Sequence, residues 1–198
     1  MKRTNIEIII TSISKLIPLS IREEEVLRNN LTAKKIKANE IIHSEGNICD
    51  FEAFIKKGIL RTYYTIDGNE RILNFFEENQ WISDFKSFTL QEPSKITIQA
   101  IEDCELVLIK NSQMKLLSQQ ISNWDLLGKL FFKKLFIQNF NHLESLLISS
   151  PEERYADLLK NRTALINRIP QYFIAQYIGV QPESLSRIRK RIVAKVTS

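Results

Sequence analysis

The chain has 198 residues, of which 43% are hydrophobic and 26% are charged, so it is long and apolar enough to bury a core. Its two cysteines are too few for a disulfide framework or a four-cysteine iron–sulfur cluster, and its two histidines are too few for a histidine-rich metal site. The sequence contains no apolar run of about 18 residues, and its basic N-terminus is followed by an amphipathic pattern rather than a signal peptide. We therefore expect a cytoplasmic protein without a cofactor, a bound metal or a membrane span.

The positive charge of the chain is concentrated at one end. The net charge is +5, and residues 151–198 carry nine Lys and Arg against four Asp and Glu. Residues 1–150 carry 19 of each sign and are neutral overall. A neutral body with a basic terminal segment suits a nucleic-acid-binding appendage, because neutralisation of phosphates supplies most of the sequence-independent affinity. A solvated basic helix would show the same charge.

The first 31 residues predict two helices. Apolar residues recur at helical spacing between residues 4 and 17, and Pro18 ends that helix. Ser20 and Glu23 then have the spacing of a capping box, in which each side chain satisfies a free backbone N–H of the first turn.

Between residues 32 and 110 the sequence pattern changes to short runs of β-forming residues. Asp67-Gly68 lies between two such runs and predicts a hairpin, because a tight turn needs positive φ at its centre. Many short strands joined by turns predict a sandwich, jelly roll or small barrel. The runs cover residues 34–38, 41–44, 52–56, 59–66, 71–76, 96–101 and 105–109.

A short helix is expected near residues 111–118, followed by a long helix over residues 122–147. A helix of that length is about 39 Å long, and its apolar residues cover more than one stripe. We expect the β domain on one side and a second copy of the chain on the other, although one larger monomeric core would also bury two sides. The candidate dimer residues are Trp124, Leu127, Phe131 and Leu135.

Residues 149–153 separate this helix from the C-terminal part of the chain. Ser150 and Glu153 fit a second capping box, with Pro151 at the first helical position, where its missing N–H does no harm. A new helix and a new domain are therefore predicted to begin here, with a connection over residues 161–168 that holds one short helical turn.

Residues 171–192 predict a helix, a tight turn and a second helix. Ala175 is small enough for two helices to cross closely, Gly179 can end the first helix in the left-handed conformation, and Pro182 opens the second. The apolar residues are spaced to form a small core between the helices. This is the pattern of a helix-turn-helix motif.

The polar face of the second helix suits the major groove of DNA. Glu183 can accept a hydrogen bond from cytosine, Arg187 can donate two to guanine, and Ser186 can do either. The residues expected in secondary or phosphate contacts are Gln181, Ser184, Lys190, Arg191 and Lys195. A helical hairpin with a solvated charged face is the alternative.

With these motifs, nearly the whole chain resembles the Crp/Fnr family of transcription regulators. The likeness rests on Glu45-Gly46, Gly58 and Asp67-Gly68 in the β region, on the long helix, and on Glu183, Ser186 and Arg187, which match the E-x-x-S-R pattern of the Fnr branch. It implies an α+β fold with an N-terminal β-roll of the cyclic-nucleotide-binding type, also called a double-stranded β-helix or jelly roll, with flanking helices. It further implies a sensor domain over residues 1–120, a long dimerisation helix over 121–148 and a winged-helix-like DNA-binding domain over 149–198.

Three departures from the family pattern have consequences. Pro182 replaces the arginine of the cyclic-AMP receptor branch, so the DNA preference of that branch is not expected here. The connection at 161–169 is too short for the usual wing, so we expect a short or absent wing. The Gly-Glu and Arg-Ser or Arg-Thr pairs that hold a cyclic nucleotide are also missing; the corresponding effector-pocket candidates are Ile82, Ser83, Ser94 and Lys95. We expect no response to cyclic AMP, because a point-charge lysine is a poor substitute for a bidentate arginine.

The resulting hypothesis is a homodimeric, sequence-specific DNA-binding transcription regulator of bacterial type, not an enzyme. Its expected partners are double-stranded DNA with a palindromic operator, a second copy of the chain and, as a further candidate, RNA polymerase, while the small-molecule effector stays unknown. The alternatives are a cupin-like metal enzyme on the same β-roll, which would need a cluster of His and carboxylate ligands, and a signalling adaptor that does not bind DNA. Cys49 could be a redox-sensitive thiol, but a small buried hydrophobe is the favoured interpretation.

Overall fold

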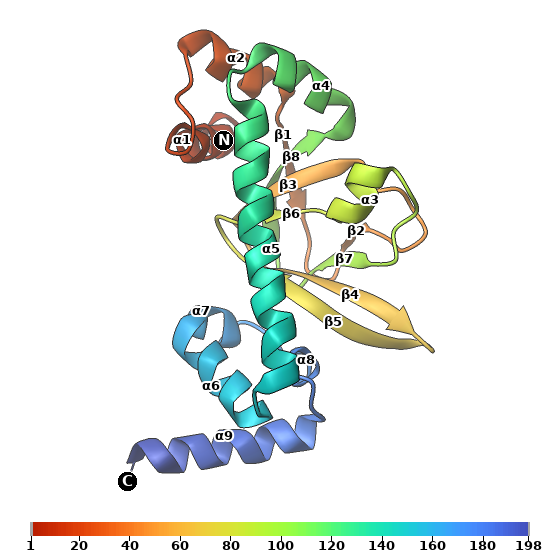
Figure 1. The fold of residues 1–198 in the computed structure, drawn as a ribbon, viewed down its shortest axis with the longest axis vertical. Coiled ribbons are helices and arrows are strands. Elements are labelled where there is room, and N and C mark those ends of the chain that lie inside the picture. Colours follow the sequence, from red (N-terminus) through yellow and green to blue (C-terminus); the bar gives the residue numbers. More distant parts are fainter. Residues whose placement is uncertain (1, 198) are drawn as a thin grey trace.

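The computed structural model describes residues 2–197 and has an α+β architecture: a β-roll flanked by helices, one long helix, and a group of helices at the C-terminal end (Figure 1). The strands are β1 (Thr32–Ile36), β2 (Ile41–His43), β3 (Phe51–Lys57), β4 (Leu60–Ile66), β5 (Asn69–Phe76), β6 (Trp81–Ile82), β7 (Thr97–Ala100) and β8 (Cys104–Lys110). The helices are α1 (Lys2–Ser14), α2 (Ile21–Asn30), α3 (Phe85–Leu90), α4 (Asn111–Gln120), α5 (Trp124–Ile148), α6 (Pro151–Asn161), α7 (Thr163–Ile166), α8 (Gln171–Tyr177) and α9 (Pro182–Thr197). The predicted fold class is confirmed.

The β-roll consists of two four-stranded antiparallel sheets, in the orders β1-β8-β3-β6 and β2-β7-β4-β5. The hairpin predicted at Asp67-Gly68 joins β4 to β5, and both turn residues have positive φ, 51° and 74°. Alternate residues of the strands point into the space between the sheets, where Ile55, Leu60 and Ile98 are fully buried. The sheets therefore share one apolar interior.

Helices close one end of the β-roll. The Ser20–Glu23 capping box is present at the start of α2, with both reciprocal hydrogen bonds. Ile9 and Ile13 of α1 and Leu27 of α2 pack with residues of β3, β8, α4 and the first turn of α5 in one buried cluster. Helix α1 ends at Ser14, one turn earlier than predicted.

Two short elements were not predicted. Strand β6 has only two residues, and α3 has six, so neither is long enough to show a hydrophobic period. Strand β6 depends on a tertiary contact, because Trp81 and Ile82 pair with Phe54 and Ala53. Helix α3 begins at a local cap, in which the Asp84 carboxylate accepts from the N–H groups of Lys86 and Ser87.

The C-terminal helices pack directly on the β-roll. The second capping box, Ser150 with Glu153, is present at the start of α6, and Pro151 is the first residue of that helix, as expected. One buried cluster contains Phe75 of β5 together with Phe173 and Tyr177 of α8, and Leu185 of α9. This core crosses the domain boundary that we propose at residue 149. None of the helices in the described part of the chain is both long enough and apolar enough to cross a bilayer.

Candidate nucleic-acid interface

The turn between α8 and α9 has the geometry that the sequence predicts. Gly179 has φ +73°, its N–H donates to the Gln176 carbonyl at 3.1 Å, and the N–H of Val180 donates to the Ala175 carbonyl at 2.9 Å. These two bonds are the Schellman pattern that closes a helix end. Ala175 is completely buried beneath the turn, so no larger side chain would fit there.

A small apolar core holds the two helices together. Ile174 and Ile178 from α8 and its cap meet Leu185 and Ile188 of α9, and all four side chains are buried. Because successive residues of a helix turn by about 100°, burial of Leu185 and Ile188 directs Glu183, Arg187 and Lys190 to the opposite side. These three residues are exposed, as is Ser186.

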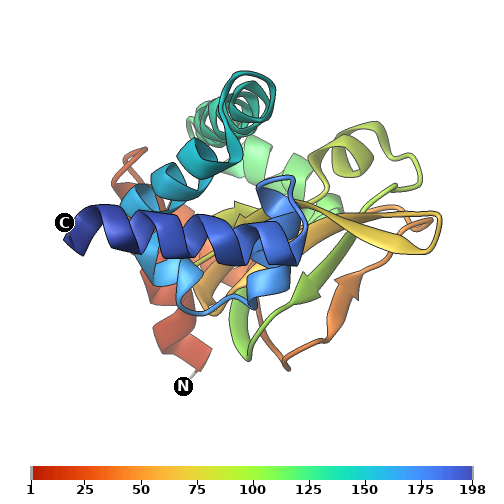
Figure 2. The same ribbon diagram turned by 90° about the horizontal axis from the view of Figure 1, so that it is seen from below.

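Helix α9 lies across one end of the molecule. Figure 1 shows it at the far end of α5 from the N-terminal helices, and Figure 2, viewed from that end, shows it in front of all other elements. Within the described part of the chain, the side chains of Glu183, Arg187 and Lys190 make no hydrogen bond or ion pair. The predicted base-reading residues are thus brought together on an open surface with their polar groups free.

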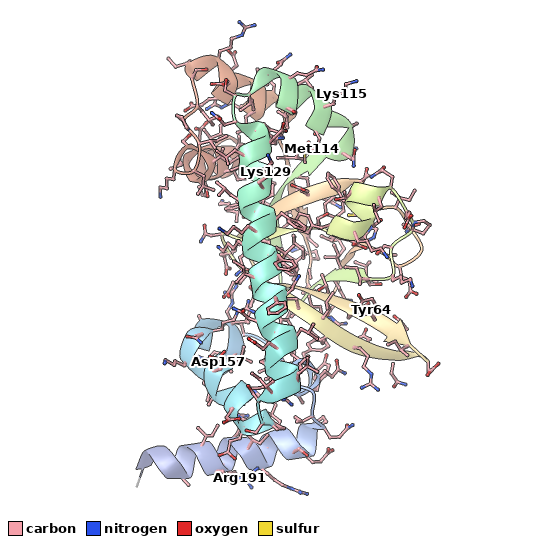
Figure 3. The ribbon with its side chains drawn as sticks, in the orientation of Figure 1. Tyr64, Met114, Lys115, Lys129, Asp157 and Arg191 are labelled. Carbon is pink, nitrogen blue, oxygen red and sulfur yellow. The ribbon has the colours of Figure 1, made fainter. Side chains whose placement is uncertain are left out.

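The residues predicted to make secondary or phosphate contacts with DNA lie around this face, as far as the structure describes them. Gln181 in the turn is exposed, Ser184 is half-buried, and Arg191, labelled in Figure 3, lies 3.4 Å from the Glu152 carboxylate of α6. The side chain of Lys195 lies outside the described residues. Sequence reasoning gave no role to Arg189, whose guanidinium donates to Gln171 at 2.9 Å and so joins α9 to the start of α8.

Three arginines that the sequence analysis left without a role fix the position of the helix-turn-helix. Arg162 donates to the Glu77 carboxylate at 2.9 Å and to the Phe75 carbonyl, and Arg168 donates to Glu78 at 2.7 Å and to Glu102. Arg154 donates to the Ile178 carbonyl at 2.8 Å and to the carbonyl groups that end α5. The Arg168 ion pair holds the pKa of Glu78 down, at about 2.

The long helix α5 has the two apolar sides that the sequence predicts, but the dimer residues need correction. Leu127 is 2% exposed, and Trp124, Phe131 and Leu135 also pack against clusters of the chain's own N-terminal part. These four residues form the inner face, because their spacing of three and four residues turns them all toward the β-roll.

The outer face of α5 carries a different set of apolar residues. Phe132, Phe136 and Phe140 stack in sequence, with ring centroids 6.5 and 6.1 Å apart, and Phe136 is 58% exposed. Leu143 and Leu147 continue the same stripe at helical spacing, and Figure 2 shows α5 as the outermost element on its side of the molecule. This stripe, residues 132, 136, 140, 143 and 147, is called the outer stripe below.

The effector-pocket candidates divide into two pairs. Ser83 and Lys95 line a cavity of about 210 Å³ between β4, β5, α3 and α5, beside Tyr64, which Figure 3 labels on β4. Ile82 is fully buried in the sheet interior and does not line it. Ser94 is also buried, and its hydroxyl donates to the Asp84 carboxylate at 2.6 Å. Ile82 and Ser94 are therefore removed from the candidate pocket.

Two features of this cavity were not predicted. Asp84 lines it with a carboxylate, beside the lysines Lys86 and Lys95, and Asn74 of β5 donates to Asn139 of α5 at 3.1 Å across its wall. Asp84 could have been found from the sequence as the cap of α3, whereas the Asn74–Asn139 pair joins residues 65 positions apart. Both Cys49 and Cys104 are buried, and burial raises the pKa of Cys104 to about 12, which fits an unreactive thiol at Cys104.

Comparison with known proteins identifies the β-roll and the overall architecture. Residues 33–120 match the family model of the cyclic nucleotide-binding domain. The solved structure of FixK2 from Bradyrhizobium japonicum is similar to this chain with a TM-score of 0.74 at 17% identity, over 83% of this chain and 85% of that one. A protein from Eubacterium rectale, described as a transcriptional regulator of the Crp/Fnr family, is similar with a TM-score of 0.68 at 21% identity, over 89% and 85%.

CooA from Carboxydothermus hydrogenoformans, solved as a mutant, is also similar, with a TM-score of 0.66 at 14% identity over 84% of this chain and 78% of that one. A comparison with curated protein sequences gave no match. The resemblance to Crp/Fnr regulators is thereby confirmed for the fold and for the cyclic nucleotide-binding type of the β-roll domain.

Proposed function

Because the chain has the Crp/Fnr-type fold around a cyclic nucleotide-binding domain, we propose that it is a transcription regulator that binds DNA sequence-specifically as a homodimer. The observation that carries this proposal is the exposed face of α9, where Glu183, Ser186 and Arg187 have free polar groups opposite a buried apolar side. These groups match the donors and acceptors of base edges in the major groove. Lys190 and Arg191 lie one turn further along, at the height of the phosphates.

The outer stripe of α5 supplies the dimer contact in this proposal. Five large apolar side chains at helical spacing on a free helix face lose water when two copies pair along them, as in a coiled coil. A two-fold axis along α5 presents two copies of α9 on the same side, about 34 Å apart for adjacent turns of the groove. The operator is then a palindrome, and the three-part division at residues 121 and 149 describes sensor, dimer helix and DNA-binding domain.

The cavity lined by Ser83 and Lys95 is called the sensor cavity in this proposal, and we expect that it does not bind cyclic AMP. Among the described residues, Asp84, Lys86 and Lys95 line the cavity and no arginine does, so a cyclic phosphate would lack a bidentate partner. RNA polymerase is a further candidate partner in this proposal. The cytoplasm is the expected compartment.

The experiment is a selection of duplexes from a random DNA pool by the purified protein, followed by affinity measurements on the selected and on a scrambled duplex. A regulator enriches a palindrome, and its affinity falls by about 10³-fold or more between about 50 and 200 mM salt, because bound cations are released from the DNA. An adaptor or a β-roll enzyme would enrich no sequence and would bind neither duplex at any salt concentration.

A matched pair of variants separates DNA recognition from general basic charge. Arg187→Ala removes a cation from the proposed reading face, and Lys160→Ala removes one from the exposed side of α6. We expect weaker enrichment of the palindrome, with a relaxed preference at one base pair, for Arg187→Ala, and unchanged enrichment for Lys160→Ala. Equal behaviour of the two variants would contradict the placement of α9 in the groove.

A further inference from the structure

A second cavity, of about 630 Å³, lies at the hinge between the long helix and the helix-turn-helix. Its volume is within the range of small-molecule sites, about 300 to 1,000 Å³. One wall is the C-terminal half of α5, the second is α6, where Figure 3 labels Asp157, and the third is the end of α8. The polar residues that face it include Gln138, Asn141, His142, Ser145, Arg154 and Tyr177.

Arg154 gives this cavity a positive charge without a counter-ion. Its guanidinium is half-buried and donates to the carbonyls of Ser145, Ser149 and Ile178, so its hydrogen bonds are used to hold helix ends together. Carbonyl groups satisfy the donors but do not neutralise the charge. In the part of the chain that the structure describes, no carboxylate forms an ion pair with Arg154. A half-buried, unneutralised cation favours an anion nearby.

The other charged groups on the walls have partners. Arg162 is paired with Glu77 at 2.9 Å. The Glu153 carboxylate accepts from the backbone N–H of Ser150 at 2.7 Å, and the Asp157 carboxylate accepts from the Asn161 amide at 2.6 Å. Glu153 and Asp157 are both exposed to solvent, which screens their charge more strongly than that of Arg154.

His142 lies in the wall of the cavity, near the two arginines. Its ring stacks on Tyr177 with centroids 4.1 Å apart and planes 4° from parallel, so it joins α5 to α8. Burial lowers the pKa of His142, and the charges of Arg154 and Arg162 lower it further. The acids Glu153 and Asp157 do not offset this effect, so the site disfavours a further cation.

We propose that the hinge cavity binds a small polar anion of organic-acid size, with its carboxylate or phosphate group near Arg154 and His142. The amides of Gln138 and Asn141 offer hydrogen bonds to the rest of the molecule, and the Ser145 hydroxyl, whose hydrogen is donated to the His142 carbonyl, can accept one. The occupant touches α5 and α6 and reaches the end of α8, directly before the turn at Gly179. Binding does not depend on DNA, so this inference and the proposed function can fail separately.

The two histidines of the chain allow a direct test by proton NMR. Inorganic phosphate and succinate are titrated separately into the intact protein, with sodium chloride at matched ionic strength as the blank. We expect a saturable shift of the His142 ring signals and a rise in the pKa of His142, because an anion stabilises the imidazolium. His43, buried in the β-roll, is the internal reference. The anion that saturates at the lower concentration shows whether the site prefers a phosphate or a carboxylate.

Asn141→Asp tests the position of the site. The substitution adds a carboxylate to the wall of the cavity at an exposed residue, and we expect the bound anion to lose about tenfold in affinity through repulsion. The matched control is Asn29→Asp on α2, at the opposite end of the molecule, which should leave the affinity unchanged. Shifts of His43 equal to those of His142, no saturation with either anion, or equal losses in the two variants would overturn the proposal.

Discussion

Arg187 and Lys190 lie on the same face of α9, yet the proposal gives them different tasks. Arg187 stands near the N-terminal end of the helix, where it can donate two hydrogen bonds to a guanine, and Lys190 lies one turn later. Arg187→Ala should cost about 1 to 3 kcal/mol on the selected duplex and relax specificity at one base pair. Lys190→Ala should weaken binding to selected and scrambled duplexes alike. Competition binding on single-base variants of the operator distinguishes the two, and a uniform loss with both would refute base reading by Arg187.

Position 58 requires glycine because of both its backbone conformation and its close neighbours. Its φ is +101°, and an added Cβ would lie 2.5 Å from the Cys104 Sγ and 2.9 Å from the backbone oxygen of Asp103. Gly58→Ala should therefore lower the free energy of unfolding by about 1 to 3 kcal/mol, measured by urea denaturation. Gly128 is the matched control, because it lies within α5 with nothing within 4 Å of an added Cβ. Gly128→Ala should raise the free energy of unfolding by up to about 1 kcal/mol, and the opposite order of the two variants would show that the described environment of Gly58 does not exist in solution.

Among the elements, α5 has two separate roles in the proposed dimer. Its inner side packs on the chain's own N-terminal part, and the outer stripe is proposed to contact a second copy. Phe136→Glu should convert the dimer to a monomer in sedimentation velocity, because a charge replaces an apolar contact at the middle of the stripe. Binding to a duplex with two half-sites should weaken in parallel. Ile21→Glu on α2 is the control, since Ile21 is 89% exposed and is not part of the outer stripe. A dimer that survives Phe136→Glu would show that the subunits pair elsewhere.

At the scale of the whole molecule, the helix-turn-helix and the β-roll share one core. The cluster that joins Phe75 to Phe173 and Tyr177, together with the ion pairs of Arg162 and Arg168, connects the two parts on both sides. We expect them to unfold in one transition. The change in fluorescence of Trp81 and Trp124, both of which precede the C-terminal helices α6 to α9, should coincide with the loss of helical circular dichroism. A circular dichroism transition that precedes the fluorescence change would show that the C-terminal helices unfold independently.

The sensor cavity leads to a prediction about ligands of the whole protein. Its volume of about 210 Å³ is small for a nucleotide, and Asp84 lines it, held by the Ser94 hydroxyl at 2.6 Å. Titration calorimetry with cyclic AMP should show no binding at micromolar concentrations, and the affinity for the selected duplex should not change when cyclic AMP is added. Micromolar or tighter binding would contradict this interpretation of the cavity.

The sequence predicted the features that depend on neighbouring residues. Both capping boxes, the Asp67-Gly68 hairpin, seven of the eight strands and the turn at Gly179 follow from local hydrogen bonding and from the period of apolar residues. The polar face of α9 followed in the same way, because the spacing of residues along one helix determines which side chains share a side.

By itself, the sequence determined the elements of this protein, their type and the residues that a helix can present together. Only the tertiary structure decided which side of α5 faces inward, placed Arg154, Arg162 and Arg168 against partners from distant segments, and formed the two cavities. The physical reason is that periodicity shows how many apolar sides a helix has but not what covers each side. A cavity or an ion pair between residues 77 and 162 depends on how whole elements pack.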